Sequence, residues 1–280
     1  MTMTVLRTGP LVVLKDRGRP GHGNQGVGPS GAVDRLAYAR ANALVGNPAG
    51  HAVLECTLGG LRVRCDEPAT IVLTGTDAVL TVDGSPAGPE QVVRVSAGAV
   101  VAVTAPRRGL RSYLAVRGGF DSPPVLGSRS TDPLGVGPPR PAPGDVLPIG
   151  PAPDGPAASP RADPGDGPLE VDLGPRDDWF TAAAVATFLS AAYTVSPASN
   201  SVGLRLDGPP LARSRDDELL SEGVVRGAVQ VPPDGQPIVF QADHPVTGGY
   251  PVIAVLTPRS ADRAAQARPG ARLRFARAAD

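Results

Sequence analysis

Short runs of β-branched and apolar residues recur through the first half of this chain, about one every ten residues between 52 and 116. The clearest runs are 69–74, 79–82, 92–95 and 100–104. Asp-Gly, Ala-Gly and proline turns separate them, a spacing typical of antiparallel sheets rather than of βαβ units. The sequence therefore predicts a mainly β protein built as a sandwich or barrel.

Helical patterns are few, and we expect one in each half of the chain. The first begins near Asp34, a good N-cap, and ends at Gly46. Its apolar face comprises Leu36, Ala37, Ala41, Leu44 and Val45. In the second half, a strand at 169–173 precedes a helix at 177–191, and further strands follow at 193–196 and in the closing ARPGARLRF. Trp179 and Phe180 are expected to be core anchors rather than a ligand-stacking platform.

Proline marks the expected domain boundary. Twelve of the 33 prolines lie at 133–168, where few apolar residues are available to offset the entropy of ordering. We expect an N-terminal β domain at 1–135, a mobile linker at 136–168 and a second, mostly β domain at 169–280.

Charge and targeting signals narrow the possible partners. Positive and negative side chains balance at 27 each, so no global field attracts nucleic acid or anionic membrane, and neither partner is expected. The start lacks a secretory pattern and no apolar stretch is long enough for a membrane span, which predicts a cytoplasmic protein. Cys56 and Cys65 lack metal-ligand spacing and are expected to be buried, reduced thiols, so no metal ligands are assigned.

Several familiar catalytic motifs are absent. The chain has no P-loop and no G-x-S-x-G elbow, and its three histidines have no spacing typical of a triad or metal site. The single lysine, Lys15, follows a strand and precedes Asp-Arg-Gly-Arg, which is not the exposed hairpin of a biotin carrier. No covalently attached biotin is therefore expected.

The stretch 227–255 combines turn chemistry, apolar strands and polar side chains. Two strands, at 237–241 and 250–256, flank a polar loop, and Asp243, His244, Thr247 and Tyr250 are expected to gather at one end. Gly248 and Gly249 let backbone amides approach a ligand closely. The alternative interpretation is an ordinary hairpin with a glycine bulge.

Four segments place polar residues among glycines, namely 16–34, 127–131, 196–205 and 230–250. Each has an alternative explanation as an ordinary turn. An amide or lactam reaction requires hydrogen-bond donors for the carbonyl oxygen, a group that handles the nitrogen proton, and a cation for an acidic substrate. Arg17, Arg19 and Arg129 are the candidate cations, and glycine-rich backbone at 127–128 and 248–249 supplies candidate donors. The proton-transfer candidates are Asp16, Asp34, Glu55, Asp243 and His244.

Collinear motifs over 9–275 carry a resemblance to a known family. They are KDRGRPGHGNQGVGPSGAVD, ANALVGNPAGHAVLECTLGG, SYLAVRGGFDSPPVLGSRST, WFTAAAVATF, YTVSPASNSVGLRLDGPPL, SEGVVRGAVQVPPDGQPIVFQADHPVTGGYP and AQARPGARLRF. This order resembles the C-type subunits of bacterial 5-oxoprolinases, a family also described as KipA-like, as allophanate hydrolase subunit 2 and as a biotin-dependent carboxyltransferase domain.

The resemblance implies two cyclophilin-like β-barrel domains with the ligand site in a groove between them, so that Arg19 and Thr247 face each other. It also implies two partners, the KipI-like B-type subunit and the A-type subunit, which is the lactam utilisation protein. Together these subunits would open 5-oxoproline to L-glutamate with ATP and Mg²⁺, and this chain would be inactive alone.

Residue chemistry and resemblance together assign the candidate site. The candidate catalytic residues are Asp16, Arg19, Asp34, Glu55 and Asp243. The candidate substrate-binding residues are Ser30, Ser128, Arg129, Ser130, Thr131, Asn200, Gln230, Thr247, Gly248, Gly249 and Tyr250.

Departures from the family pattern keep other functions open. The family usually has Gln at Lys15, Arg at Ser201, and Arg-Gln at His244 and Pro245. A missing arginine weakens anion binding, so either the substrate differs or activity is lost. The alternatives are a urea-type biotin-dependent carboxyltransferase component and a non-catalytic KipA-like regulator that binds a KipI-like partner.

Overall fold

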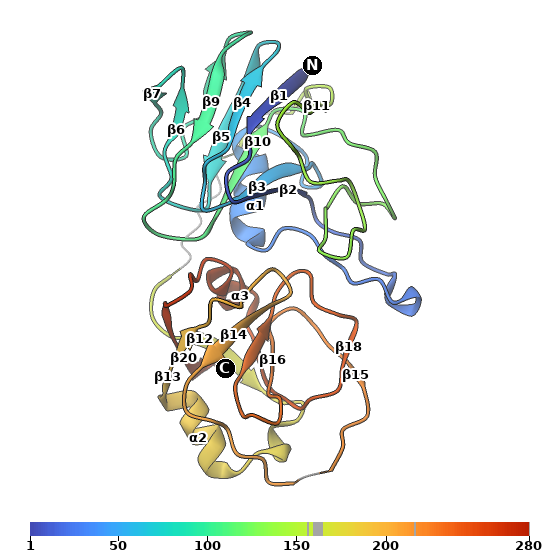
Figure 1. Ribbon diagram of the computed structural model, residues 1–280, viewed down its shortest axis with the longest axis vertical. Coiled ribbons are helices and arrows are strands. Elements are labelled where there is room, and N and C mark those ends of the chain that lie inside the picture. The colour runs from blue at the N-terminus through green and yellow to red at the C-terminus, as the bar shows by residue number, and fades with distance from the viewer. Residues whose placement is uncertain (156, 159–164, 216, 280) are drawn as a thin grey trace. The chain divides into compact units, whose positions relative to one another are not determined.

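The computed structural model describes residues 1–155, 157–158, 165–215 and 217–279, and strands dominate it (Figure 1). The predicted β class is confirmed. The chain divides into unit 1, Met1–Arg19 with Ser30–Asp163, and unit 2, Pro20–Pro29 with Pro164–Asp280. Segment 20–29 therefore belongs to the second unit although its neighbours in sequence belong to the first. Within the described ranges, no helix has the length and apolar character needed to cross a membrane.

Unit 1 contains two sheets. The six-stranded sheet has the order β11 (Val146–Pro148), β1 (Thr2–Arg7), β4 (Arg62–Cys65), β9 (Val100–Val103), β6 (Leu80–Val82) and β7 (Ser85–Pro86). The five-stranded sheet has the order β2 (Leu11–Lys15), β3 (Val53–Thr57), β10 (Arg111–Val116), β5 (Ala69–Thr74) and β8 (Val93–Val95). One apolar core contains residues of both sheets, including Val63 and Val101 of the first and Leu54 and Leu114 of the second. Alternating apolar residues thus build a layered β unit, as the ten-residue spacing predicted.

The predicted first helix is confirmed as α1 (Arg35–Leu44). The Asp34 side chain accepts a hydrogen bond from the Ala37 N–H, and Gly46 follows the helix at φ +72°. Ala37 and Tyr38 pack with strand residues Val72 and Tyr113 in a second core cluster. The helix therefore covers the outer face of the five-stranded sheet.

The segment expected to be a linker contributes to unit 1. Strand β11 pairs with β1 in the register Met3↔Leu147, and Leu147 and Ile149 are buried in the core. The linker prediction missed these two buried residues because the segment 136–168 around them is rich in proline and poor in apolar residues. Residues 156 and 159–164 of the expected linker lie outside the described part of the chain.

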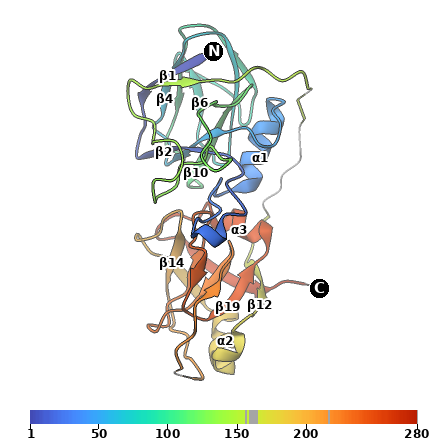
Figure 2. The same ribbon diagram turned by 90° about the vertical axis from the view of Figure 1, so that its right-hand side faces the viewer.

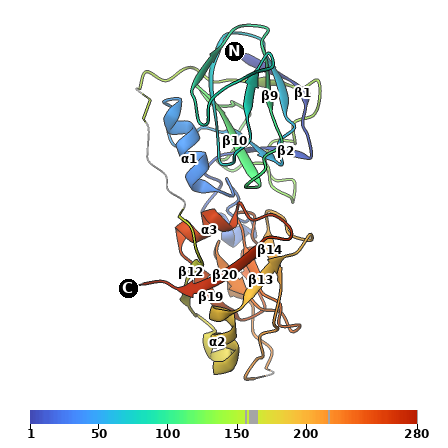
Figure 3. The ribbon, with the colours of Figure 1, turned by 90° about the vertical axis from the view of Figure 1, so that its left-hand side faces the viewer.

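Unit 2 is a closed barrel, the architecture that the resemblance implied. Its strand order is β12 (Leu169–Leu173), β19 (Val252–Leu256), β16 (Ala228–Gln230), β17 (Ile238–Phe240), β14 (Gly203–Asp207), β13 (Ala192–Val195) and β20 (Arg272–Arg277). Parallel pairing of β12 with β20 closes the barrel. Figure 3 shows β13, β14 and β20 side by side. A separate two-stranded sheet joins β15 (Glu222–Gly223) to β18 (Thr247–Gly248).

The second helix begins later than predicted. A 3₁₀ turn at Asp177–Trp179 comes first, Phe180 is extended, and α2 spans Ala182–Ser190. The physical reason is that the Thr181 side chain caps the helix by accepting from the Ala184 N–H. Trp179 and Phe180 are buried in the barrel core, as expected.

A third helix, α3 (Pro258–Ala264), was not predicted. Its start carries two ordinary signals, a Thr257 cap and proline at the first position, but its seven residues are too few for a clear apolar period. It lies against β12 and β19 (Figure 2).

The interpretation of 227–255 as two strands around a loop needs a correction. The strands exist as β17 and β19, but they do not form a hairpin, because β16 lies between them in the barrel. The intervening residues instead contribute β18, which pairs with β15. The apolar pattern of a segment predicts that it forms a strand. Which strand it pairs with depends on residues far away in the sequence.

Candidate functional site

The buried Asp16 carboxylate accepts four hydrogen bonds. Its Oδ1 accepts from the hydroxyls of Ser128 and Ser130, both at 2.6 Å, and from the Gly18 N–H at 2.7 Å. Its Oδ2 accepts from the Arg129 N–H at 2.6 Å. The carboxylate thus ties the end of β2 to loop 128–130.

Backbone N–H groups donate hydrogen bonds to the hydroxyls of Ser128 and Ser130. The Ser130 hydroxyl accepts from the Asp16 N–H at 2.9 Å, and the Ser128 hydroxyl accepts from the Ser130 N–H at 3.0 Å. Both side chains are fully buried. Each hydroxyl therefore donates to the carboxylate and accepts from the main chain, which fixes its orientation.

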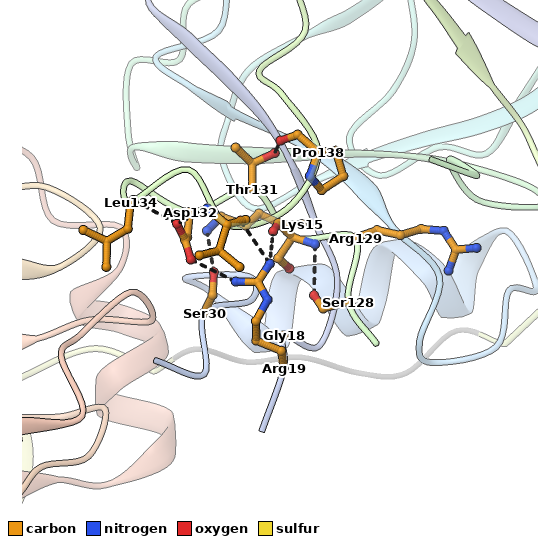
Figure 4. Close-up of polar contacts among 12 residues, drawn as sticks. Lys15, Gly18, Arg19, Ser30, Ser128, Arg129, Thr131, Asp132, Leu134 and Pro138 are labelled. Carbon is orange, nitrogen blue, oxygen red and sulfur yellow. Dashed lines mark hydrogen bonds and ion pairs between the residues drawn. The ribbon is translucent and has the colours of Figure 1, made fainter. Parts of the chain in front are cut away.

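Arg19 extends this network to the next turn (Figure 4). Its Nη1 lies 3.0 Å from Asp132 Oδ2, and its Nη2 donates to the carbonyls of Ser130 and Val136. Its Nε is buried without a hydrogen-bond partner among the described residues. The guanidinium is 0% exposed, so it acts in this conformation as an internal clamp rather than as a cation open to substrate.

Asp132 was not among the predicted site residues. Its Oδ1 accepts from the Leu134 N–H at 2.8 Å and the Val136 N–H at 3.0 Å, while its Oδ2 receives Arg19. The signal was present as Asp-Pro-Leu-Gly, an ordinary pattern of a turn held by an aspartate side chain. Nothing in that pattern indicated a buried arginine as the second partner.

Ser30, Arg129 and Thr131 complete the group in unit 1. The buried Lys15 Nζ lies 3.4 Å from Ser30 Oγ, and Ser30 has φ +51° (Figure 4). The Arg129 side chain contacts Asp121 at 2.5 Å and is partly exposed. The Thr131 hydroxyl donates to the Pro138 carbonyl at 2.9 Å. Arg129 is therefore the candidate cation of this loop whose side chain reaches solvent.

Asp34 and Glu55 belong to a second buried group. Asp34 caps α1, and Glu55 accepts from the Val33 N–H at 3.0 Å and lies 3.7 Å from Arg111 Nε. Tyr113 joins them, because its hydroxyl accepts from the Asp34 N–H at 2.8 Å. Burial, followed by the charges of Glu55 and Asp34, raises the pKa of Tyr113 well above its ordinary value. Both carboxylates thus position the start of α1.

The remaining predicted residues lie in unit 2. Asn200 accepts from the Val202 and Gly203 N–H groups, and Gln230 Nε2 donates to the Tyr250 carbonyl at 2.8 Å. The backbone of Asp243 donates to Ser201 O at 2.9 Å.

The turn at 247–250 is also shaped by Gln230. A Cβ at Gly248 would lie 2.4 Å from Gln230 Nε2, so a side chain there would have to displace the Gln230 amide. Thr247 is exposed, and Tyr250 is 43% exposed. Arg19 and Thr247 lie in different units, and their facing each other stays a prediction.

Comparisons with known proteins identify the family. Residues 25–277 match the model of the carboxyltransferase domain, subdomain A and B. The chain is 37% identical over 268 residues to the C-type subunit of Escherichia coli 5-oxoprolinase, covering 91% of this chain and 84% of the relative. It is 30% identical to the corresponding 5-oxoprolinase subunit of Haemophilus influenzae, covering 94% and 86%.

A solved structure shows the same fold in a longer protein. The crystal structure of the Kluyveromyces lactis urea amidolyase aligns with a TM-score of 0.90 and 27% identity, covering 98% of this chain but only 18% of that chain. The match to a family model over most of the sequence agrees with this structural likeness. The chain belongs to the carboxyltransferase domain family, subdomains A and B.

Proposed function

We propose that this chain is the C-type subunit of an ATP-dependent 5-oxoprolinase, which opens 5-oxoproline to L-glutamate together with the A-type and B-type subunits. The observation that carries the proposal is the nearly end-to-end likeness to its E. coli counterpart, at 37% identity. The chain acts as one part of the enzyme and has no lactamase activity alone. The proposal places the complex in the cytoplasm, where ATP is available.

The described residues support a binding and positioning role. Asp16, Ser128 and Ser130 hold loop 127–131 in place, and Arg129 at its surface is the cation offered to the substrate carboxylate. In unit 2, Asp243 is the candidate for handling the lactam nitrogen proton, and the backbone at Gly248 and Gly249 supplies hydrogen-bond donors.

ATP and Mg²⁺ enter the proposal as requirements of the whole complex. Among the residues that the structure describes, no three His, Cys, Asp or Glu side chains group as metal ligands. We therefore assign no residue of this chain to the nucleotide or its metal. When bound to the complex, ATP would supply phosphoryl activation of the lactam.

Reconstitution tests the proposal. The purified KipI-like subunit and the lactam utilisation protein, mixed with this chain, 5-oxoproline, ATP and Mg²⁺, should release glutamate, and omission of this chain should stop the release. The variant Arg129→Ala should raise KM, since it removes the proposed carboxylate contact, whereas Arg64→Ala, at an exposed ion pair, should leave KM unchanged. A complete mixture that binds together but releases no glutamate would refute the proposed reaction.

A urea-type carboxyltransferase component is the second candidate. The observation in its favour is the TM-score of 0.90 to the urea amidolyase structure. This function requires a separate biotin carboxylase and a biotin carrier. Carboxylation of urea by a mixture of those proteins with this chain, without glutamate release in the first assay, would favour it over the oxoprolinase.

A further inference from the structure

Gln241 in unit 2 carries two buried polar atoms without partners. The residue is 1% exposed, and neither Oε1 nor Nε2 has a hydrogen-bond partner among the described residues. Buried polar groups of this kind are rare in folded proteins and call for a partner.

The backbone around Gln241 is held on both sides. Its N–H donates to Val202 O at 2.9 Å, and its carbonyl accepts from the His244 N–H at 3.3 Å. Gln241 directly follows β17 and opens the segment that leads to Asp243 and the turn at 247–250. The backbone that carries the unpaired amide is therefore fixed, two residues before Asp243 in the sequence.

Gln236, in the same unit, shows how a glutamine side-chain amide pairs when a partner is present. Gln236 Oε1 accepts from the Gly208 N–H at 2.9 Å, and Gln236 Nε2 donates to the Gly208 carbonyl at 3.1 Å. One side-chain amide thus pairs with a neighbouring donor and acceptor at once. In Gln241 the same two atoms, Oε1 and Nε2, have no hydrogen-bond partner among the described residues.

We propose that Gln241 binds the amide edge of a small ligand whose N–H and C=O lie on the same side, as they do in a lactam or in urea. This inference rests on the proposed function and names the group that recognises the reacting amide. The ring constrains the lactam amide to present its donor and acceptor together, which matches the acceptor and donor of Gln241.

The same pairing discriminates the substrate from its product. Ring opening converts the lactam carbonyl into a carboxylate, which has two acceptors and no donor. A carboxylate can accept from Nε2 but places its second oxygen against Oε1, so the pairing is lost. The amide of Gln241 therefore holds 5-oxoproline more tightly than the glutamate side chain that replaces it.

Segment 20–29 lies against the residues that follow Gln241 in the sequence. A Cβ at Gly28 would lie 2.7 Å from the His244 carbonyl, so the segment packs directly on the residues that follow Gln241. The hydrogen bonds of this fully described segment are internal, between Gln25 or Val27 and His22 and between Gly26 and Gly23. It can move away without breaking a hydrogen bond to the barrel, and such segments open at low cost.

Paired variants test the inference in the reconstituted complex. Gln241→Leu should raise KM for 5-oxoproline about 10- to 100-fold, because two hydrogen bonds to the ligand are lost. The same variant should keep or raise the unfolding midpoint of the free chain, since it removes two unpaired atoms. The control Gln236→Leu should do the opposite, lowering the midpoint with KM unchanged, because its amide is already paired within the protein.

The results separate this inference from the proposed reaction. A Gln241→Leu complex that hydrolyses 5-oxoproline with unchanged KM overturns the inference and keeps the reaction, and a lowered midpoint would then indicate that the amide pairs only with a bound water. If the wild-type complex releases no glutamate, binding of 5-oxoproline, 2-pyrrolidinone and urea to it is measured by saturation-transfer NMR. Binding that Gln241→Leu abolishes supports the inference, whereas binding that is absent or unchanged overturns it.

Discussion

The Arg19 guanidinium lies 3.0 Å from the Asp132 carboxylate, and the two side chains are 0% and 8% exposed. The pair joins the loop after β2 to the turn that precedes β11, through partners on both sides. Asp132→Asn would leave the arginine charge buried without a counterion. We expect this variant to lose about 3–5 kcal/mol of unfolding free energy, measured by urea denaturation.

An exposed pair in the same unit provides the control. Arg108 is 91% exposed and lies 3.7 Å from Asp77. Because water screens such a pair, Arg108→Gln should cost less than about 1 kcal/mol. Equal losses for Asp132→Asn and Arg108→Gln would contradict a special role for the buried pair.

Replacing Asp16 distinguishes a positioning carboxylate from a catalytic one. Asp16→Asn puts an NH₂ group where one carboxylate oxygen accepts hydrogen bonds, so at least one donor loses its partner and faces another donor. We expect a loss of about 2 kcal/mol or more in unfolding free energy, together with reduced complex activity. A variant with unchanged stability but no activity would instead indicate that Asp16 acts directly in the chemistry.

A methyl group at Gly28 should loosen segment 20–29. The added Cβ of Gly28→Ala would lie 2.7 Å from the His244 carbonyl, too close for an ordinary contact. Amide hydrogen exchange at Gln25 and Val27 should accelerate, since their hydrogen bonds to the His22 carbonyl would lose the packing that holds this turn against the barrel. Gly50→Ala, where a Cβ meets nothing within 4 Å, should leave exchange unchanged. Equal exchange in both variants would show that segment 20–29 does not depend on this contact.

The Cys65 thiol is expected to make the unfolding free energy depend on pH in the alkaline range. Burial, followed by the charge of Asp66, raises the pKa of its thiol from 9.0 to about 11. Above pH 9.0 the unfolded chain loses this proton while the folded chain keeps it, so the unfolding free energy falls as pH rises from 9.0 towards 11. Below that window the thiol has no effect. Cys65→Ala should show a shallower fall in urea denaturation across the window, and an identical slope would contradict this assignment.

Local features of the fold followed from the sequence because their causes are local. Strand β5 (Ala69–Thr74) and helix α1 agree with prediction, since β-branched runs, an Asp34 cap and a Gly46 stop act within a few residues. The later start of α2 and the missed α3 show the limit of this reasoning. In both cases a threonine cap decided where a short helix began.

The candidate site could be predicted as a set of polar loops but not as a set of contacts. Asp16 was singled out as a proton-transfer residue, and the structure shows it occupied by four donors. Asp132 was overlooked because its second partner lies 113 residues away in sequence. For Gln241 the apolar pattern predicts only the end of a strand, since an unpaired amide becomes visible only when its surroundings are known.

By itself, the sequence determined the β class, the main strands and the family. The reason is that the apolar period, the turn residues and the collinear motifs are all local features of the sequence. Only the tertiary structure decided that β16 separates β17 from β19, that Arg19 meets Asp132, and that segment 20–29 belongs to the second unit. The physical reason is that pairing and burial are settled by competition among all segments at once. The type of a side chain limits which partners it can pair with, and the folded structure determines which of those partners it meets.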